Sequence, residues 1–355
     1  MKIDAYEKLY GKGSIKLGSE VLPPKIVSTG LFRFDYGIAK IGGLPLGRVI
    51  EFAGKFSAGK SSMCMNITKA AQAQGYTCAW VDLEGDSYDS KWAAQIGVDP
   101  EKLLILPVKG LGGEEILERV KALIVLSDPP LSFITFDSVA NIRAKAQFAA
   151  GEKGTDISMH TKLARASLLT DFFQSLFGGF CIKGSDTKYR LNDYPTSLLL
   201  INHLKTQFGA FGSSKDESIG GDAGKFASTM RFFMERVGYC YESKQSDGSY
   251  THARVKIHCE KNKLAEPFNS GEFLFNLKTC AFEEDYKFLL KESIENGLVE
   301  KSGSWFIYND VKAQGEKGFK ELCDKDADFY KKVIEGIKNK NIFEEEDANK
   351  NISDS

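Results

Sequence analysis

The feature that most constrains the fold of this chain is the octapeptide Gly54-Lys55-Phe56-Ser57-Ala58-Gly59-Lys60-Ser61. It fits the phosphate-binding loop pattern G-x-x-x-x-G-K-[ST] at every fixed position. The apolar run at residues 49–52 predicts a buried strand before the loop, and residues 62–73 carry apolar side chains at helical spacing after it. Strand, loop and helix in this order are the context that the motif requires. We therefore expect an α/β fold that binds a nucleoside triphosphate.

The residue types in this loop have chemical reasons. Gly54 and Gly59 let the backbone curve closely around a phosphate, and the N–H groups of the loop and of the helix start, through Ser62, favour the anion. Lys60 is expected to contact the terminal phosphates, and the Ser61 hydroxyl to bind Mg²⁺. The alternative, a chance glycine-rich turn, is disfavoured because the flanking pattern is intact.

Composition narrows the class of protein further. The chain has 355 residues, enough for one large core and a second small domain. We find no run near the ~18 apolar residues of a membrane span, and residues 1–4 lack the apolar core of a signal peptide. Seven cysteines without a C-x-x-C pair fit reduced thiols in the cytosol. A net charge of -1 gives no bulk attraction to nucleic acid, so any DNA binding must be local.

Strands alternate with helices along the first 270 residues, which predicts a mostly parallel sheet covered on both faces. The predicted strands are 77–82, 132–139 and 197–201, and the predicted helices are 114–126 and 164–176. Two later apolar runs, 232–240 and 253–259, are expected to pair antiparallel. The pattern then changes to a small α+β domain, with a helix at 286–296, a strand at 305–308 and a last helix marked by Phe329, Val333 and Ile337.

Two carboxylates follow predicted strands. Asp137 ends an apolar strand that comes two elements after the loop, so we expect it beside the phosphates, where it positions the water ligands of magnesium. Glu84 follows the strand 77–82, and ligands of parallel sheets bind at the carboxyl ends of strands. It either polarises a water molecule for attack on the γ-phosphate or merely caps the next helix. The residues alone leave both alternatives open.

Two long polar segments interrupt the predicted core. Residues 145–165 carry four positive and two negative side chains (Lys145, Lys153, Lys162 and Arg165 against Glu152 and Asp156), a net +2. Residues 205–225 are neutral and contain glycines and two phenylalanines. Such segments either bind a phosphate backbone and stack bases or are solvent-exposed loops. Composition alone favours exposed loops.

Several collinear runs identify a resemblance. They are Tyr10-Gly11-Lys12-Gly13-Ser14-Ile15, Gly42-Gly43-Leu44-Pro45-Leu46-Gly47-Arg48, the phosphate loop, Phe136-Asp137-Ser138-Val139-Ala140, Ile201-Asn202, Gly220-Gly221, Lys225-Phe226-Ala227-Ser228 and Lys261-Asn262-Lys263. On these runs the chain resembles the RecA recombinase family over nearly its whole length. The resemblance implies a short N-terminal oligomerisation segment (1–27), a RecA-type P-loop ATPase core (28–270), a small C-terminal α+β domain (271–340) and an acidic disordered tail (341–355).

The family resemblance also implies an activity. It is that of an ATP-dependent DNA recombinase, which binds ATP and Mg²⁺, forms a helical filament by self-association on single-stranded DNA, and exchanges strands with homologous double-stranded DNA. No membrane partner is expected. Two alternatives share the core: a ring helicase, and a regulatory recombinase paralogue that does not exchange strands. The complete set Lys60, Ser61, Glu84 and Asp137 argues against the paralogue.

Individual roles follow from the matched positions. The resemblance makes Glu84 the general base, Asp89 and Trp92 the adenine contacts, and Lys261 and Lys263 the pair that reaches the γ-phosphate of the neighbouring subunit. Phe226 falls in the subunit interface. The two polar segments, about 143–163 and 204–225, become DNA-binding loops. Their implied DNA contacts are Lys153, Lys162, Arg165, Lys205, Phe208, Phe211, Gly220 and Gly221.

Departures from the family pattern are informative too. His203 replaces the usual glutamine after Ile201-Asn202, between the γ-phosphate and the second loop, and we expect it to couple ATP to DNA. The N-terminal segment is short, and residues 181–195 look like an inserted surface hairpin. These features indicate a divergent member, of the kind that phages encode. It is expected to be cytoplasmic, or in the host cytoplasm if a phage encodes it.

Overall fold

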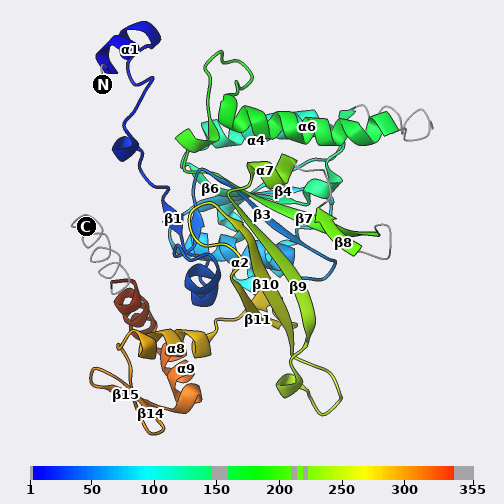
Figure 1. Ribbon diagram of the computed structural model, residues 1–355. Coiled ribbons are helices and arrows are strands. Elements are labelled where there is room, and N and C mark those ends of the chain that lie inside the picture. Colours follow the sequence, from blue (N-terminus) through cyan, green and yellow to red (C-terminus); the bar gives the residue numbers. More distant parts are fainter. Residues whose placement is uncertain (1–2, 146, 148–158, 209–213, 219–222, 340–355) are drawn as a thin grey trace.

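The computed structural model describes residues 3–145, 147, 159–208, 214–218 and 223–339 (Figure 1). Their centre is a 10-stranded sheet with the order β12-β11-β10-β9-β3-β7-β6-β4-β5, to which β8 adds beside β7. The strands from β9 to β5 run parallel. They are β3 (Val49–Gly54), β4 (Thr77–Asp82), β5 (Leu103–Leu106), β6 (Leu131–Asp137), β7 (Ser197–Phe208) and β9 (Met230–Tyr239). The predicted α/β fold with a mostly parallel sheet is confirmed.

Antiparallel strands extend one side of this sheet. β10 (His252–Asn262) pairs with β9 as predicted, and β11 (Ser270–Asn276) and β12 (Ala281–Phe282) follow it. The sheet thus continues past residue 271, where the sequence places the start of the small domain. In the middle of the sheet, β7 is longer than the predicted strand, because its residues 204–208 pair with β8 (Ser214–Ser218).

Two apolar layers enclose the sheet. Successive residues of a strand point to opposite faces, so Ile50 contributes to one core cluster and Val49 to the other. Helices α2 (Lys60–Ala73) and α3 (Ser90–Ile96) cover the first face, and α4 (Gly113–Leu126) and α6 (Met159–Gly178) the second. Figure 1 shows α4 and α6 above the sheet and α2 below it. Both faces of the parallel strands are therefore buried, which explains their continuous apolar sequence.

The C-terminal part has its own core. Helix α8 (Tyr286–Glu295) and α9 (Gly315–Lys325) pack with a three-stranded antiparallel sheet. Its strands are β13 (Glu300–Ser302), β14 (Trp305–Tyr308) and β15 (Val311–Gln314). Residues 327–339 are helical, and Phe329, Val333 and Ile337 are buried together, as their spacing predicts. The predicted small α+β unit is confirmed.

Contacts from residues 31–38 attach this unit to the large sheet. The Phe32 ring belongs to the C-terminal core, and the Phe32 N–H donates to Glu284 at 2.7 Å. Arg33 forms an ion pair with Asp285. Through these contacts, residues 31–38 link the C-terminal unit to the core that carries the phosphate loop.

The N-terminal segment lies away from the body. Helix α1 (Ile3–Tyr10) stands apart in Figure 1, and both Leu9 in this helix and Leu22 after it are exposed. Residues after α6 form the expected hairpin, in which Phe180 and Tyr189 exchange backbone hydrogen bonds. None of the helices in the described ranges combines the length and apolar character needed to cross a membrane.

Candidate active site

The phosphate loop connects β3 to α2 as predicted. Gly59 has φ 80° at the start of α2, a left-handed conformation that glycine adopts without steric cost. At Gly54 a Cβ atom would lie 2.3 Å from the Met234 carbonyl oxygen of the neighbouring strand, so only glycine fits. The glycines of the motif therefore meet requirements of the backbone in this structure.

Lys60 lies inside the loop. Its Nζ donates to the carbonyl oxygens of Gly54 at 3.1 Å and Lys55 at 2.9 Å. Burial lowers the pKa of Lys60, and the nearby carboxylates of Asp137 and Glu84 oppose this shift. The ammonium borders a cavity of about 210 Å³ that is lined by residues 57–62, Glu84, Asp137, Ile201 and His203. Residues that follow β3 and β4 thus meet residues of β6 and β7 at one place, where ligands of parallel sheets bind.

Asp137 is the most deeply buried carboxylate of this cavity, with 2% of its surface exposed. Burial raises its pKa to about 7, although a hydrogen bond from Ser61 lowers it. Its Oδ2 is buried and has no hydrogen-bond partner among the described residues. A hydroxyl and a carboxylate with an unused oxygen fit a hard cation that is bound partly through water, as Mg²⁺ commonly is.

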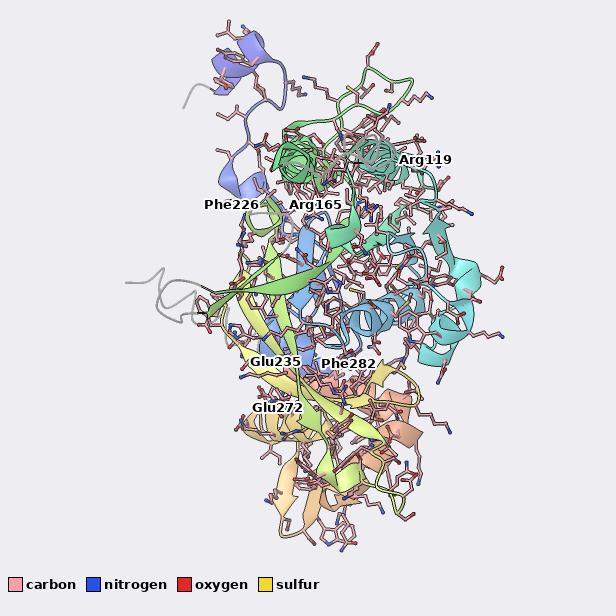
Figure 2. The ribbon with its side chains drawn as sticks, turned by 90° about the vertical axis from the view of Figure 1, so that its right-hand side faces the viewer. Arg119, Arg165, Phe226, Glu235, Glu272 and Phe282 are labelled. Carbon is pink, nitrogen blue, oxygen red and sulfur yellow. The ribbon has the colours of Figure 1, made fainter. Side chains whose placement is uncertain are left out.

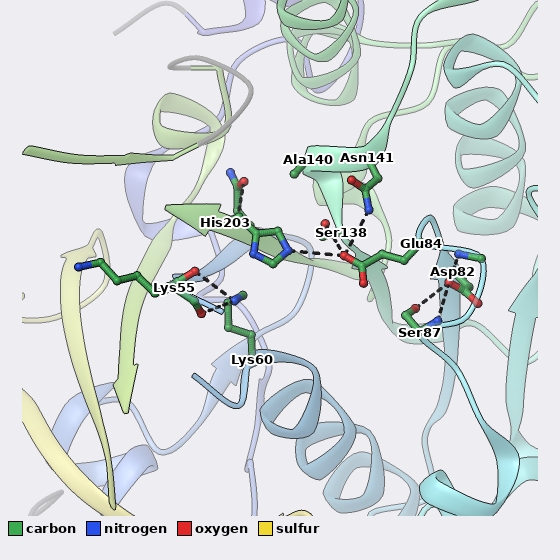
Figure 3. A network of polar contacts seen from close by, with 12 residues as sticks. Lys55, Lys60, Asp82, Glu84, Ser87, Ser138, Ala140, Asn141 and His203 are labelled. Atoms are coloured by element: carbon green, nitrogen blue, oxygen red, sulfur yellow. Dashed lines mark hydrogen bonds and ion pairs between the residues drawn. The ribbon is translucent and has the colours of Figure 1, made fainter. Parts of the chain in front are cut away.

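Glu84 accepts hydrogen bonds from three sides at one oxygen. Figure 3 shows Oε1 contacted by Ser138 Oγ at 3.1 Å, Asn141 Nδ2 at 3.2 Å and His203 Nε2 at 3.5 Å. Its side chain is about one third exposed and lines the cavity. The next helix, α3, is capped by Asp89 instead, whose Oδ1 accepts from the Trp92 N–H at 2.7 Å. The interpretation of Glu84 as a helix cap is therefore wrong.

His203 lies on β7 beside the loop. Its ring packs on the Phe56 ring, with 4.7 Å between centroids, while Nδ1 is buried without a partner among the described residues. Burial lowers the pKa of His203, Lys60 adds to the shift, and Glu84 opposes it. The imidazole is thus expected to be neutral at pH 7.

Two contributors to the site were missed by reasoning from the sequence. Asp82 Oδ1 accepts from the Gly85 N–H at 2.8 Å and from Ser87 Oγ at 2.7 Å, which holds the turn that carries Glu84. Asn141 was missed as well, although it closely follows Asp137. The signal available for both was a polar side chain near the carboxyl end of a strand that adjoins a known site.

The structure does not bring every predicted residue to this cavity. Asp89 and Trp92 are absent from its lining, and Trp92 packs partly buried against the first core cluster. Lys261 is the second-last residue of β10, and its Nζ donates to the carbonyl oxygens of Lys225 at 2.6 Å and Phe226 at 3.4 Å. The adenine and lysine contacts stay predictions.

The predicted DNA contacts are only partly described. Lys153, Phe211, Gly220 and Gly221 lie outside the described residues, and Lys162, Lys205 and Phe208 are described by their backbone alone. Arg165 on α6 is turned to the Ala140 carbonyl oxygen, to which its Nη1 donates at 2.6 Å. Burial lowers the pKa of this guanidinium. Figure 2 labels Arg165 and also Phe226, which lies on the neighbouring helix α7 (Ala223–Ala227) and is 75% exposed.

A larger cavity of about 720 Å³ lies elsewhere. It is formed by the end of β9, parts of β10 and β11, and helices α8 and α9. None of the predicted site residues lines it. The residues with nucleotide chemistry surround the smaller cavity, so size does not identify the active site here.

Comparison with known proteins gives one consistent result. The family described as RecA N-terminal domain matches residues 1–278. Protein RecA of Chlorobium chlorochromatii is 32% identical over 344 residues, which covers 95% of this chain and 89% of the relative. Protein RecA of Clostridium novyi is 31% identical over 342 residues, with the same coverage. Protein RecA of an Arthrobacter species is 33% identical over 305 residues, covering 85% and 79%.

Proposed function

The chain belongs to the RecA family, and we propose that it is an ATP-dependent DNA recombinase. It assembles as a helical filament on single-stranded DNA, pairs this strand with a homologous duplex and exchanges strands, with hydrolysis of ATP that DNA stimulates. The observation that carries the proposal is the meeting of Lys60, Asp137, Glu84 and His203 around one cavity at the phosphate loop. These residues supply the charges and hydrogen bonds that phosphoryl transfer requires.

Binding of the triphosphate rests on the loop. The backbone N–H groups of residues 54–62 surround the phosphates, and the Lys60 ammonium exchanges its carbonyl partners for phosphate oxygens. The Ser61 hydroxyl and, through water, Asp137 Oδ2 would hold Mg²⁺. A bound Mg²⁺ neutralises phosphate charge and thereby lowers the barrier to transfer. On the adenine side we assign contacts to Asp89 and Trp92.

Hydrolysis depends on the placement of Glu84. All three donors among the described residues meet its Oε1, so Oε2 stays available to orient and polarise the attacking water. His203 Nε2 lies 3.5 Å from this carboxylate and borders the same cavity as Lys60. It can therefore donate to a γ-phosphate or to Glu84, which makes it the residue that reports the nucleotide state to β7.

Self-association is supported by the surface. The exposed ring of Phe226 and the exposed apolar residues of the N-terminal segment lack burial in the single subunit. The edge strand β5 exposes Leu104 and Ile105, and an open strand edge can accept a further chain. Lys261 and Lys263 lie outside the cavity of their own subunit, which fits a role at the γ-phosphate of the next one.

The DNA contacts are assigned to the two segments that follow β6 and β7. Lys153 and Lys162 of the first segment, and Arg165 just after it, are proposed to bind phosphates. The proposed DNA contacts of the second segment are Lys205, Phe208, Phe211, Gly220 and Gly221. In this segment, backbone N–H groups and aromatic rings would contact the DNA strand. Both segments start near Glu84 and His203, so DNA and nucleotide lie close enough to influence each other.

Electron microscopy with parallel measurement of ATP hydrolysis tests the proposal. With ATP and single-stranded DNA we expect helical filaments and a turnover rate that rises with DNA. Closed rings would support the helicase alternative. Filaments that bind ATP but exchange no strands in a duplex assay would support the regulatory alternative.

A further inference from the structure

Asn141 lies between the catalytic carboxylate and the first DNA segment. Its Nδ2 donates to Glu84 Oε1 at 3.2 Å (Figure 3). Its backbone N–H donates to the Ser138 carbonyl oxygen at 2.9 Å. The Ser138 hydroxyl donates to the same Glu84 oxygen. The turn after β6 thus offers two donors to Glu84, and Asn141 is the one closer to the DNA segment.

Hydrogen bonds fix the chain at both ends of that segment. Arg165, which follows the segment, donates to the carbonyl oxygen of Ala140, the residue before Asn141. Arg143, which begins it, accepts at its carbonyl oxygen from the Gly113 N–H at 2.8 Å. Arg165, which is implied to contact DNA, therefore bonds to the residue next to Asn141, and Asn141 contacts Glu84.

A second cavity marks the same connection. It has a volume of about 330 Å³ and is lined by Leu83, Glu84, Val108, Leu111, Ile116, Asn141 and Arg143. Glu84 also lines the nucleotide cavity. The Glu84 side chain thus lies between the nucleotide cavity and this second cavity, whose lining includes Arg143 at the start of the DNA segment.

We propose that Asn141 is a positioning residue for Glu84 and that the Arg165–Ala140 hydrogen bond makes this position depend on DNA. The inference rests on the proposed function. The Arg165 guanidinium cannot direct the same N–H to the Ala140 carbonyl and to a DNA phosphate. DNA that draws Arg165 away releases the Ala140–Asn141 peptide and shifts the donor on Glu84. Arg165 thus contacts DNA only in the state in which Ala140 is released. Such a difference in contacts is the condition for DNA to shift the equilibrium between the two positions of Asn141.

Substitution of Asn141 tests the first part. Asn141→Ala removes the donor, and Asn141→Asp keeps the shape but places an acceptor beside the carboxylate. Because a hydrogen bond to a charged group is worth about tenfold in rate or more, we expect kcat to fall at least tenfold in both, without DNA and with saturating DNA. The KM for ATP should change less than twofold, since Asn141 does not touch the phosphate loop. Asn269→Ala, which removes a side-chain bond to a backbone carbonyl outside the site, is the matched control.

An aspartate variant with the wild-type kcat would overturn this assignment, because this variant loses the donor and also places a negative charge beside Glu84. A thermal melt of each variant separates misfolding from mispositioning: a low kcat counts as support only when the melt matches that of the control. A wild-type protein whose turnover ignores DNA would contradict the proposed function, while the DNA-free kcat of the variants would still decide whether Asn141 positions Glu84.

A double-mutant cycle tests the second part. If Arg165 acts through Asn141, then Arg165→Ala mimics the released state and shifts the DNA-free kcat toward the DNA-stimulated value, while the double variant has the DNA-free kcat of Asn141→Ala alone. If Arg165 is only a phosphate ligand, Arg165→Ala weakens DNA binding, but its DNA-free kcat equals that of the wild type. Effects that multiply in the double variant would likewise refute the connection.

Discussion

The contact between Phe56 and His203 leads to a prediction about coupling between ATP and DNA. Phe56 is 83% exposed on the phosphate loop, yet its ring packs on the imidazole that faces Glu84. Replacing it by alanine should affect global stability little, because little of its surface is buried. The imidazole, however, loses the surface that fixes its orientation. Phe56→Tyr retains a ring and serves as the control.

The size of the effect follows from the ring contact. An aromatic pair contributes about 0.5–1.5 kcal/mol beyond its buried area, which corresponds to about two- to twelvefold in an equilibrium constant. Phe56→Ala should therefore reduce the tightening of DNA binding by a non-hydrolysable ATP analogue by about this factor. His203→Ala, which removes the imidazole itself, should abolish the tightening while ATP still binds.

The protonation of His203 should change in a defined direction. Burial is the main cause that lowers the pKa of His203, so removal of Phe56 should raise this pKa toward its ordinary value of about 6.5. As pH falls toward that value, the variant then gains an imidazolium beside Glu84 before the wild type does. Its DNA coupling should accordingly become pH-dependent at a higher pH than that of the wild type.

Two assays measure these quantities. Fluorescence anisotropy of a labelled single strand gives the DNA affinity with and without the ATP analogue. Proton NMR of the four histidines gives the pKa of His203, whose resonance is identified by its loss in His203→Ala. If Phe56→Ala leaves both the coupling and the His203 titration as in the wild type, the ring contact has no functional role.

Three further predictions concern the site and its assembly. Lys60→Ala and Glu84→Gln should both abolish turnover, but only Lys60→Ala should greatly weaken nucleotide binding in a fluorescent-nucleotide titration; full hydrolysis by Glu84→Gln would show that the base lies elsewhere. On single strands, log K of DNA binding falls with log of the salt concentration by roughly 0.7 per phosphate contact. Neutralising Lys153 and Lys162 together should therefore flatten this slope, and an unchanged slope would exclude the first segment from the DNA surface. Mixtures of Lys263→Ala with Glu84→Gln subunits should regain activity at junctions that pair an intact base with intact lysines, whereas filaments with no activity at any mixing ratio would place the lysines at their own subunit's site.

Much of the fold followed from local patterns in the sequence. The motif at residues 54–61 fixes strand, turn and helix together, since each glycine is required by backbone conformation or by a close neighbour. The continuous apolar strands identified a parallel sheet because both of its faces are buried. Strand ends and the extension of the sheet by β11 and β12 were harder to predict. They depend on pairing between distant segments, which leaves a weak signal in each segment alone.

Charged residues in and around the candidate site also differ in how well the sequence predicts them. Lys60, Glu84 and Asp137 stand at recognisable positions after predicted strands. The buried ion pair of Glu51 and Arg231 has no such signal, because the partners are 180 residues apart and lie in apolar strands. Here tertiary pairing, which the local sequence does not encode, makes a buried charge tolerable.

Glu84 lines the cavity at the phosphate loop and is contacted by a residue that precedes each of the two predicted DNA segments. Its Oε1 is contacted by Asn141, which precedes the first segment, and by His203, which precedes the second. Two donors that share one acceptor cannot act independently, since a shift of either changes the oxygen that the other contacts. DNA bound to either segment can therefore alter the same carboxylate. On the proposed function, a single strand that engages both segments should therefore change turnover more than DNA that engages only one of them.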